Sequence, residues 1–111
     1  MFSLPLILAC VLSGEREEQL RLAPKYDAQM EVTLRDGTRV DLLNKTHAIE
    51  IDYARKWAEG CAQALHYAHM TDKRPGLILL VSNKKSDWKS AVRAAYLCGK
   101  YDITLYVEEI P

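Results

Sequence analysis

The feature that most constrains the fold is an uninterrupted apolar run, Gly-Leu-Ile-Leu-Leu-Val, at residues 76–81. A strand with one face in water alternates apolar and polar residues, so a run that is apolar throughout predicts a strand buried on both faces. Such a strand lies inside a sheet that helices cover on both sides. The chain has 111 residues, enough for one domain with this kind of core and no disulfide support.

Three further strands are predicted before this run. Residues 30–35 and 38–43 each alternate in the manner of a half-buried strand, and the Asp36-Gly37 pair between them is a strong hairpin signal. A second turn at residues 44–46 leads to a third strand at residues 48–52. Three strands joined by tight turns predict an antiparallel meander.

Helical patterns occupy most of the remaining chain. We expect a helix over residues 15–22 that Pro24 ends or bends, and a second over residues 53–69 with an apolar stripe. A third is expected over residues 88–98, with Ser86 as N-cap and Gly99 as its stop, followed by a strand at residues 102–107. The order is α-β-β-β-α-β-α-β, which predicts an α/β fold with a mixed central sheet flanked by helices.

Three carboxylates and a lysine follow one another at the ends of two predicted strands. Glu50 and Asp52 share one face of their strand because alternate residues point the same way, and Asp41 can join them if the two strands are neighbours. Clustered carboxylates repel one another unless a cation lies between them, and a hard divalent cation such as Mg²⁺ prefers oxygen ligands. Lys56 adds a positive charge nearby, so the set predicts a metal-dependent phosphoryl-transfer site.

The helix after these carboxylates carries a second stripe, distinct from its apolar one. Lys56, Gly60, Gln63 and Tyr67 are spaced to lie along one side of a helix that should border the carboxylates. A glycine within a helix costs about 1 kcal/mol relative to alanine, and close approach of a strand, a metal-bound water or the substrate backbone would explain it. Gln63 and Tyr67 can hold a phosphate or a base through neutral hydrogen bonds.

Charge is unevenly distributed along a chain whose formal net charge is zero. Residues 54–100 contain nine Lys or Arg and three Asp or Glu, a balance of +6. A basic half beside an acidic site suits a polyanionic substrate, and Lys84 and Lys85 are candidates for phosphate contact. Ordinary variation of surface charge is the alternative, since no dense Lys/Arg block is present.

These residues together resemble the PD-(D/E)XK, or restriction-endonuclease-like, nuclease superfamily. Asp41 on a hairpin strand, Glu50 on the next strand and Gln63-x-x-x-Tyr67 on the following helix resemble its RecB-type branch, including small bacterial and phage members. The similarity extends over residues 31–82, and the αβββαβαβ order matches the superfamily core.

The resemblance implies roles for individual residues. Asp41 and Glu50 correspond to metal ligands for Mg²⁺ or Mn²⁺, the main-chain carbonyl of Ile51 is a further ligand, and Gln63 and Tyr67 support the substrate. Glu31, or Glu18 on the first helix, could supply an extra acid.

The chain departs from the superfamily pattern at one important position. Asp52 stands where the catalytic lysine belongs, and Lys56, one turn later, is its natural substitute. Asp52 then becomes a metal ligand or a partner that positions Lys56. If Lys56 does not reach the site, the protein would bind metal and DNA without cutting.

We therefore expect a metal-dependent nuclease that acts on DNA, in which a metal-bound water oriented by Lys56 attacks a backbone phosphate. The alternative is a catalytically inactive nucleic-acid- or protein-binding module on the same fold, and a third is an unrelated α/β protein. A double-strand cut by so small a domain would need a homodimer.

The ends of the chain and its cysteines leave other questions open. Residues 1–13 are almost wholly apolar and fit either a signal peptide of an exported protein or a hydrophobic arm on a cytoplasmic one. Residues 14–111 would form a single nuclease-like domain without a membrane segment. Cys61 and Cys98 lie among small apolar residues and are expected to be buried free thiols.

Overall fold

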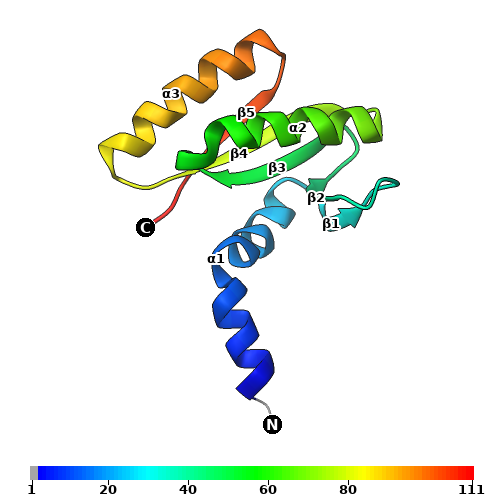
Figure 1. Ribbon diagram of the computed structural model, residues 1–111, viewed down its shortest axis with the longest axis vertical. Helices are drawn as coiled ribbons and strands as arrows, with labels where there is room; N and C mark the ends of the chain where they lie inside the picture. The colour runs from blue at the N-terminus through cyan, green and yellow to red at the C-terminus, as the bar shows by residue number, and fades with distance from the viewer. Residues whose placement is uncertain (1–2) are drawn as a thin grey trace.

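In the computed structural model, five strands form one mixed sheet with three helices packed around it (Figure 1). The structure describes the backbone of residues 3–111 and the side chains of residues 14–111. The elements are α1 (Ser3–Lys25), β1 (Gln29–Thr33), β2 (Arg39–Leu43), β3 (His47–Tyr53), the short 3-10 helix η1 (Ala54–Lys56), α2 (Trp57–Thr71), β4 (Arg74–Val81), α3 (Lys85–Lys100) and β5 (Thr104–Glu109). The predicted α/β class and the predicted order of elements are confirmed.

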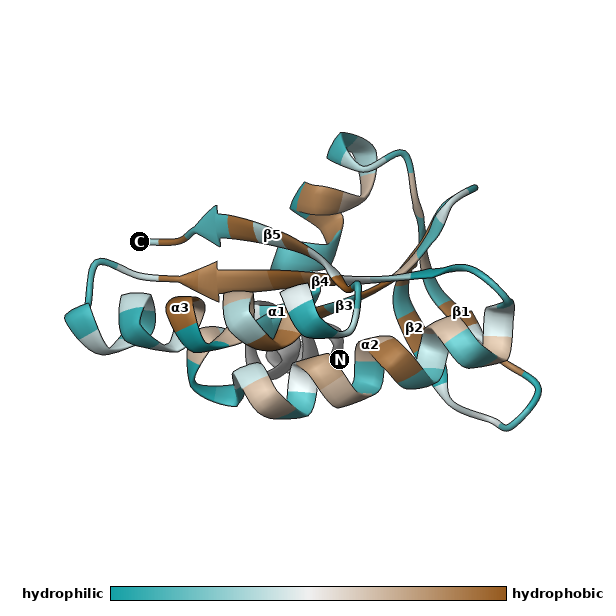
Figure 2. Ribbon diagram, turned by 90° about the horizontal axis from the view of Figure 1, so that it is seen from above, coloured by the Kyte–Doolittle hydropathy of each residue, from teal (hydrophilic) through white to brown (hydrophobic). Residues whose placement is uncertain are grey.

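The strands lie in the sheet in the order β1-β2-β3-β4-β5. The pairs β1–β2 and β2–β3 are antiparallel, and the pairs β3–β4 and β4–β5 are parallel because α2 and α3 return the chain to the same edge. The apolar run falls on β4, where every residue from Leu77 to Val81 is at most 1% exposed. Figure 2 shows this strand as a continuous apolar ribbon beside β5.

Helices cover both faces of the sheet. On one face, α2 and α3 pack on Leu77, Leu79 and Val81, and on the other face α1 packs with Leu22 on residues that include Ile49, Ile51 and Ile78. Figure 1 shows α1 on the opposite side of the sheet from α2 and α3. Full burial of each such side chain stabilises the fold by about 1.5–3 kcal/mol.

The predicted hairpin turn is confirmed at residues 36 and 37. Gly37 has φ +88°, a left-handed conformation that favours glycine, and Leu34 N donates to Thr38 O over 2.8 Å. The Asp36 carboxylate accepts hydrogen bonds from the main-chain N and the hydroxyl of Thr38. These contacts fix the register of β1 and β2.

The predicted helix ends were less accurate. Residues 53–69 are not one helix, because Tyr53 still pairs with Leu80 as part of β3 and a 3-10 turn precedes α2. Ser86 is not an N-cap: α3 begins at Lys85, and the Asp87 carboxylate accepts from the main-chain N and the hydroxyl of Ser82. Gly99 does not stop α3, which continues to Lys100.

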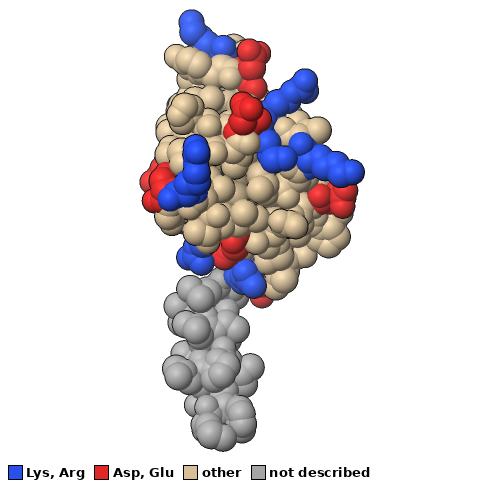
Figure 3. All heavy atoms as spheres, turned by 90° about the vertical axis from the view of Figure 1, so that its right-hand side faces the viewer, with Lys and Arg blue, Asp and Glu red and all other residues tan. Residues whose placement is uncertain are grey.

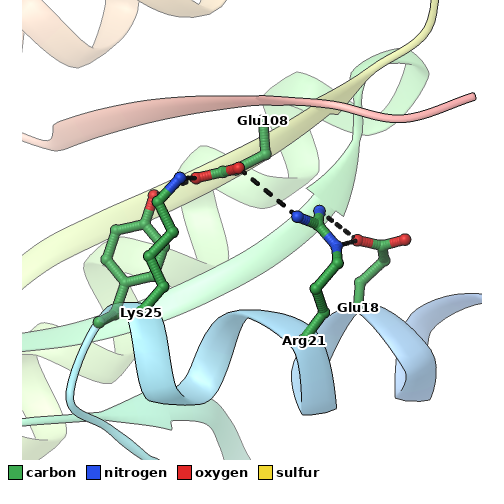
Figure 4. A network of polar contacts seen from close by, with 5 residues as sticks. Glu18, Arg21, Lys25 and Glu108 are labelled. Atoms are coloured by element: carbon green, nitrogen blue, oxygen red, sulfur yellow. Dashed lines mark hydrogen bonds and ion pairs between the residues drawn. The ribbon is translucent and has the colours of Figure 1, made fainter.

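Helix α1 is longer than the predicted residues 15–22, and Pro24 lies in its last turn. Its C-terminal half is joined to β5 through Glu108, which accepts hydrogen bonds from Lys25 Nζ and from the Tyr26 hydroxyl, each over 2.6 Å. Arg21 lies 3.8 Å from the same carboxylate and also pairs with Glu18 (Figure 4). Burial opposes ionisation of Glu108, but these partners outweigh it and lower its pKa.

The predictions about the apolar segment at residues 1–13, a signal peptide or a hydrophobic arm, fall outside the side chains that the structure describes. Within the described part of the chain, none of the helices has the length and apolar character needed to cross a bilayer.

Candidate active site

Two carboxylates occupy buried positions on β3, an otherwise apolar strand. Glu50 and Asp52 pair in register with Leu77 and Leu79 of β4 and share their face of the sheet, beneath α2. They are only 5% and 8% exposed. The intervening Ile51 faces α1, so the predicted alternation along this strand is correct.

Asp41 joins this pair at the point where β2 separates from β3. Regular pairing of the two strands covers Leu42 with Ile49 and Leu43 with Ala48. Beyond it, Asp41 Oδ2 accepts a hydrogen bond from the main-chain N of Ile51 over 2.8 Å. The carboxylate therefore replaces the main-chain acceptor that β2 no longer offers, which holds it beside Glu50.

Glu31 lies on the other side of Asp41. Met30 pairs with Leu42 and Val32 with Val40, so Glu31 falls opposite Asp41 at an irregular point of β1 where its φ is +52°. Burial raises the pKa of Asp41 most, and the charge of Glu31 adds to the effect. Glu31 also pairs with Arg16 over 3.4 Å, near the surface.

Of the two predicted extra acids, only Glu31 lies near the cluster. Glu18 instead pairs with Arg21 in the network at Glu108.

The three carboxylates share protons. Burial, the charge of Asp41 and hydrogen bonding to Asp41 and Asp52 raise the pKa of Glu50 to about 11. Burial also raises the pKa values of Asp41 and Asp52. Glu50 is therefore protonated at neutral pH, and its single O–H donates to either Asp41 or Asp52. This is how closely placed carboxylates avoid mutual repulsion when no cation lies between them.

Helix α2 covers the cluster closely because residue 60 is glycine. A Cβ at this position would lie 2.9 Å from Leu77 Cδ1 and 3.2 Å from Asp52 Oδ2, closer than ordinary van der Waals contact. The expected reason for the mid-helix glycine, close approach of a strand, is therefore correct. Any larger side chain would separate α2 from β3.

Gln63 and Tyr67 extend this side of α2 toward Glu50. With the Gln63 amide oriented so that both of its ends find partners, its nitrogen lies 3.0 Å and 3.3 Å from the two carboxylate oxygens of Glu50. The same nitrogen lies 3.2 Å from the Tyr67 hydroxyl. Burial and the charges of Glu50 and Asp41 raise the pKa of Tyr67 to about 12, so this phenol stays protonated and neutral.

Lys56 affects Asp52 through its charge but forms no ion pair with any of the three carboxylates. It ends η1 ahead of α2, is exposed, and forms no ion pair within 4 Å with any residue between 14 and 111. Burial raises the pKa of Asp52, while a hydrogen bond with Glu50 and the charge of Lys56 act in the opposite direction. The lysine thus acts on the cluster over a distance, without direct contact.

Lys84 and Lys85 are exposed at the beginning of α3, which packs over β4 and β5, whereas Asp41 lies on β2. In the part of the chain with described side chains, no hydrogen bond or ion pair connects either lysine to the carboxylates. The structure does not bring them into the cluster.

Gln19 of α1 is a member of the site that the sequence prediction missed. It is 3% exposed, and its Nε2 donates to Asp41 Oδ1 over 3.1 Å. Its Oε1 is buried and finds no hydrogen-bond partner among residues 14–111. A signal was present, because Gln19 precedes Leu22 by three residues and Ala23 by four and so shares their buried side of α1.

The oxygen atoms of this site suit a hard divalent cation in kind. Asp41 and Glu50 are buried carboxylates, and Asp41 is hydrogen-bonded to Gln19, whose amide oxygen has no hydrogen-bond partner among residues 14–111. However, no three Asp, Glu, His or Cys side chains of residues 14–111 are arranged as a complete metal-binding group. Neutral oxygens, such as that of Gln19 or the Ile51 carbonyl, would have to complete the coordination.

Comparison of the chain with protein-family models, curated proteins and solved structures gave no match.

Proposed function

We propose that this protein is a metal-dependent nuclease that hydrolyses phosphodiester bonds in DNA. The observation that carries the proposal is the buried cluster of Asp41, Glu50 and Asp52. Burying several carboxylates together destabilises a fold, so a protein that keeps them is expected to use them. Their most direct use is to hold a cation against a phosphate.

The architecture supports a restriction-endonuclease-like core. Its features are the αβββαβαβ order, an antiparallel meander that continues into parallel strands, and a carboxylate site between the meander and the first crossover helix. The position of Gln63 and Tyr67 over Glu50 agrees with the resemblance to the Gln-x-x-x-Tyr branch of PD-(D/E)XK nucleases.

In this proposal Asp41, Glu50 and the Ile51 carbonyl hold Mg²⁺ or Mn²⁺, with the Gln19 amide oxygen as a neutral neighbour. When bound, the cation would lower the pKa of a water molecule and neutralise charge on the phosphate. Metal binding also requires that Glu50 lose its proton, so affinity should increase with pH.

The protein side chains supply positioning and charge. Gln63 fixes the orientation of the Glu50 carboxylate, and Tyr67 in turn fixes Gln63. Gly60 keeps α2 close enough for both contacts. Lys56, exposed beside Asp52, is available to pair with a phosphate and to stabilise the negative charge that develops during its hydrolysis.

The second candidate function is a binding module that does not cut. The observation that favours it concerns Lys56, which forms no ion pair with Asp41 or Glu50 in the described part of the chain, residues 14–111. With Asp52 in place of the superfamily lysine, no lysine of residues 14–111 forms an ion pair with the three carboxylates. Such a protein would bind nucleic acid or a protein partner on the same fold.

The proposal is tested by incubating purified protein with linear, circular and branched DNA in Mg²⁺, Mn²⁺ or EDTA. Glu50→Gln keeps the shape of the protonated side chain and should abolish cutting, and Lys56→Ala should reduce it at least about 100-fold. Lys45→Ala, an exposed lysine in the turn before β3, is the matched control and should cut normally. Absence of metal-dependent cutting by folded wild-type protein would favour the binding module.

A further inference from the structure

The outer face of α3 is unusual because it exposes large apolar side chains. Trp88, Val92 and Tyr96 are 42%, 57% and 80% exposed, while Ala91, Ala94 and Cys98 form the buried side of the same helix. The exposed three are spaced four residues apart and so follow one side of the helix. Two of them, Trp88 and Tyr96, are aromatic.

Basic side chains lie between these apolar residues. The exposed cations of the helix are Lys85, Lys89, Arg93 and Lys100. At about 100° per residue they share with Trp88 and Tyr96 an arc of roughly 140°. None of them forms an ion pair with a residue in the 14–111 range.

Little negative charge opposes these cations on α3. Asp87 is the one acid of the helix, and its carboxylate already accepts hydrogen bonds from the main-chain N and the hydroxyl of Ser82. By contrast, Lys or Arg and Asp or Glu side chains alternate over the face that Figure 3 presents, on the right-hand side of Figure 1. The outer face of α3 therefore differs in charge balance from that mixed surface.

The basic character continues from α3 toward the carboxylates. The beginning of α3 packs on η1, which carries Arg55 and Lys56. Hydrogen bonds from Ser82 lower the pKa of Asp87 in the first turn of α3, and the charges of Lys84 and Arg55 add to the effect. Lys84 and Arg55 therefore lie close enough to this turn to act on it. Because η1 directly follows β3, the basic residues lead to the strand that holds Asp52.

We propose that the outer face of α3, defined by Lys85, Trp88, Lys89, Arg93 and Tyr96, binds a single-stranded nucleic acid and leads it toward the carboxylate site. The cations contact phosphates, and the two rings stack on unpaired bases. Rings cannot stack in this way on a duplex, whose base faces are covered. The inference rests on the proposed function and adds to it the strand form of the substrate.

A second copy of the chain is a less suitable occupant of this face. In a symmetric dimer the same residues meet across the axis, so the three cations of this face (Lys85, Lys89 and Arg93) would face those of the other copy. An extended polyanion instead neutralises all of them at once. Charge complementarity thus favours nucleic acid over self-association.

The test is fluorescence anisotropy with a labelled oligothymidylate and a labelled hairpin duplex, both in EDTA so that nothing is cut. Wild type should bind the single strand more tightly. Lys89→Glu with Arg93→Glu should weaken that binding at least about tenfold and reduce the slope of log affinity against log salt by about 1.4. The matched control, Arg35→Glu with Lys45→Glu on exposed loop cations, should stay within about twofold of wild type.

The aromatic variant separates stacking from charge. Trp88→Ala with Tyr96→Ala should lower single-strand affinity about tenfold per ring and leave duplex affinity unchanged. These positions are exposed, and a thermal melt verifies that the variants fold. Unchanged single-strand affinity in the aromatic variant would overturn the inference. So would a loss of affinity in the loop control as large as that of the α3 charge variant. A wild-type dimer that the aromatic variant converts to a monomer without loss of single-strand binding would also overturn it.

The inference and the proposed function fail in different ways. Protein that binds single strands through α3 but never cuts them would refute only the nuclease. If the protein cuts DNA and the α3 substitutions leave its single-strand affinity unchanged, only the binding face is refuted.

Discussion

Asp41 Oδ2 accepts a hydrogen bond from the main-chain N of Ile51 over 2.8 Å, where β2 separates from β3. One carboxylate thus serves both the sheet and the candidate site, since its other oxygen accepts from Gln19. Structural and functional roles of Asp41 have to be distinguished by the choice of substitution.

Asp41→Ala should lower the free energy of unfolding by about 1–3 kcal/mol, because it leaves the buried N–H of Ile51 and the Gln19 amide without an acceptor. Asp41→Asn keeps an acceptor, removes a charge from the cluster and should stay within about 1 kcal/mol of wild type. Urea denaturation in EDTA measures both. If the proposed site binds Mg²⁺, the ion should raise the melting temperature of the wild type and of neither variant. An Asn variant that still gains stability from Mg²⁺ would remove Asp41 from the proposed metal site.

Glu50 should make the protein less stable as pH rises. Its folded-state pKa is raised from 4.5 to about 11, so the folded state holds a proton that the unfolded state releases. The stabilisation from this proton is complete below the unfolded pKa and is lost as pH rises through the folded pKa. The glutamine of Glu50→Gln has no proton to release over this range. The unfolding free energy of the variant relative to wild type should therefore increase between pH 5 and pH 9, by about 1 kcal/mol or more.

Thermal melts in EDTA across this pH range measure the difference. Mg²⁺ should reduce it, because a cation that replaces the proton stabilises the wild type alone. Asp36→Asn is a matched control. Hydrogen bonds from Thr38 lower the pKa of this exposed carboxyl, so Asp36 is already ionised at pH 5. The difference in stability between this variant and wild type should therefore not grow above pH 5. A constant difference between wild type and Glu50→Gln would contradict the shared-proton description of the site.

The sequence was sufficient to predict some parts of this molecule and not others. The apolar run on β4 and the alternation along β3 are local patterns, so they correctly predicted a central strand and a shared face for Glu50 and Asp52. The role of Gln19 depends on which part of the sheet α1 covers, and that is a tertiary contact. The same applies to Lys56, whose direction changes because Tyr53 stays in the strand and η1 intervenes.

Glu108 should contribute stability that disappears in acid. Lys25 and Tyr26 hold its pKa below the ordinary value against the effect of burial, so its contribution is present above the unfolded pKa and lost as pH falls through the folded pKa. Glu108→Gln should lower the unfolding free energy at pH 7 by about 1–3 kcal/mol, and the loss should shrink toward pH 3. Denaturant titrations at both pH values measure it. Glu109→Gln, exposed on the same strand, should have little effect at either pH, and equal losses in the two variants would contradict the role of the network.

Two helical glycines should respond oppositely to the same substitution. Alanine is favoured over glycine within a helix by about 1 kcal/mol. Gly99→Ala on α3 should gain up to this amount, because its Cβ would meet no atom of residues 14–111 within 4 Å. Gly60→Ala should instead lose about 1–3 kcal/mol, because its Cβ would press on Leu77 Cδ1 at 2.9 Å and on Asp52. Displacing α2 also moves Gln63 away from Glu50, so cutting should fall with stability. Urea denaturation of both variants makes the comparison, and a stabilised Gly60→Ala protein would mean that α2 does not lie as close to β3 as the carboxylate site requires.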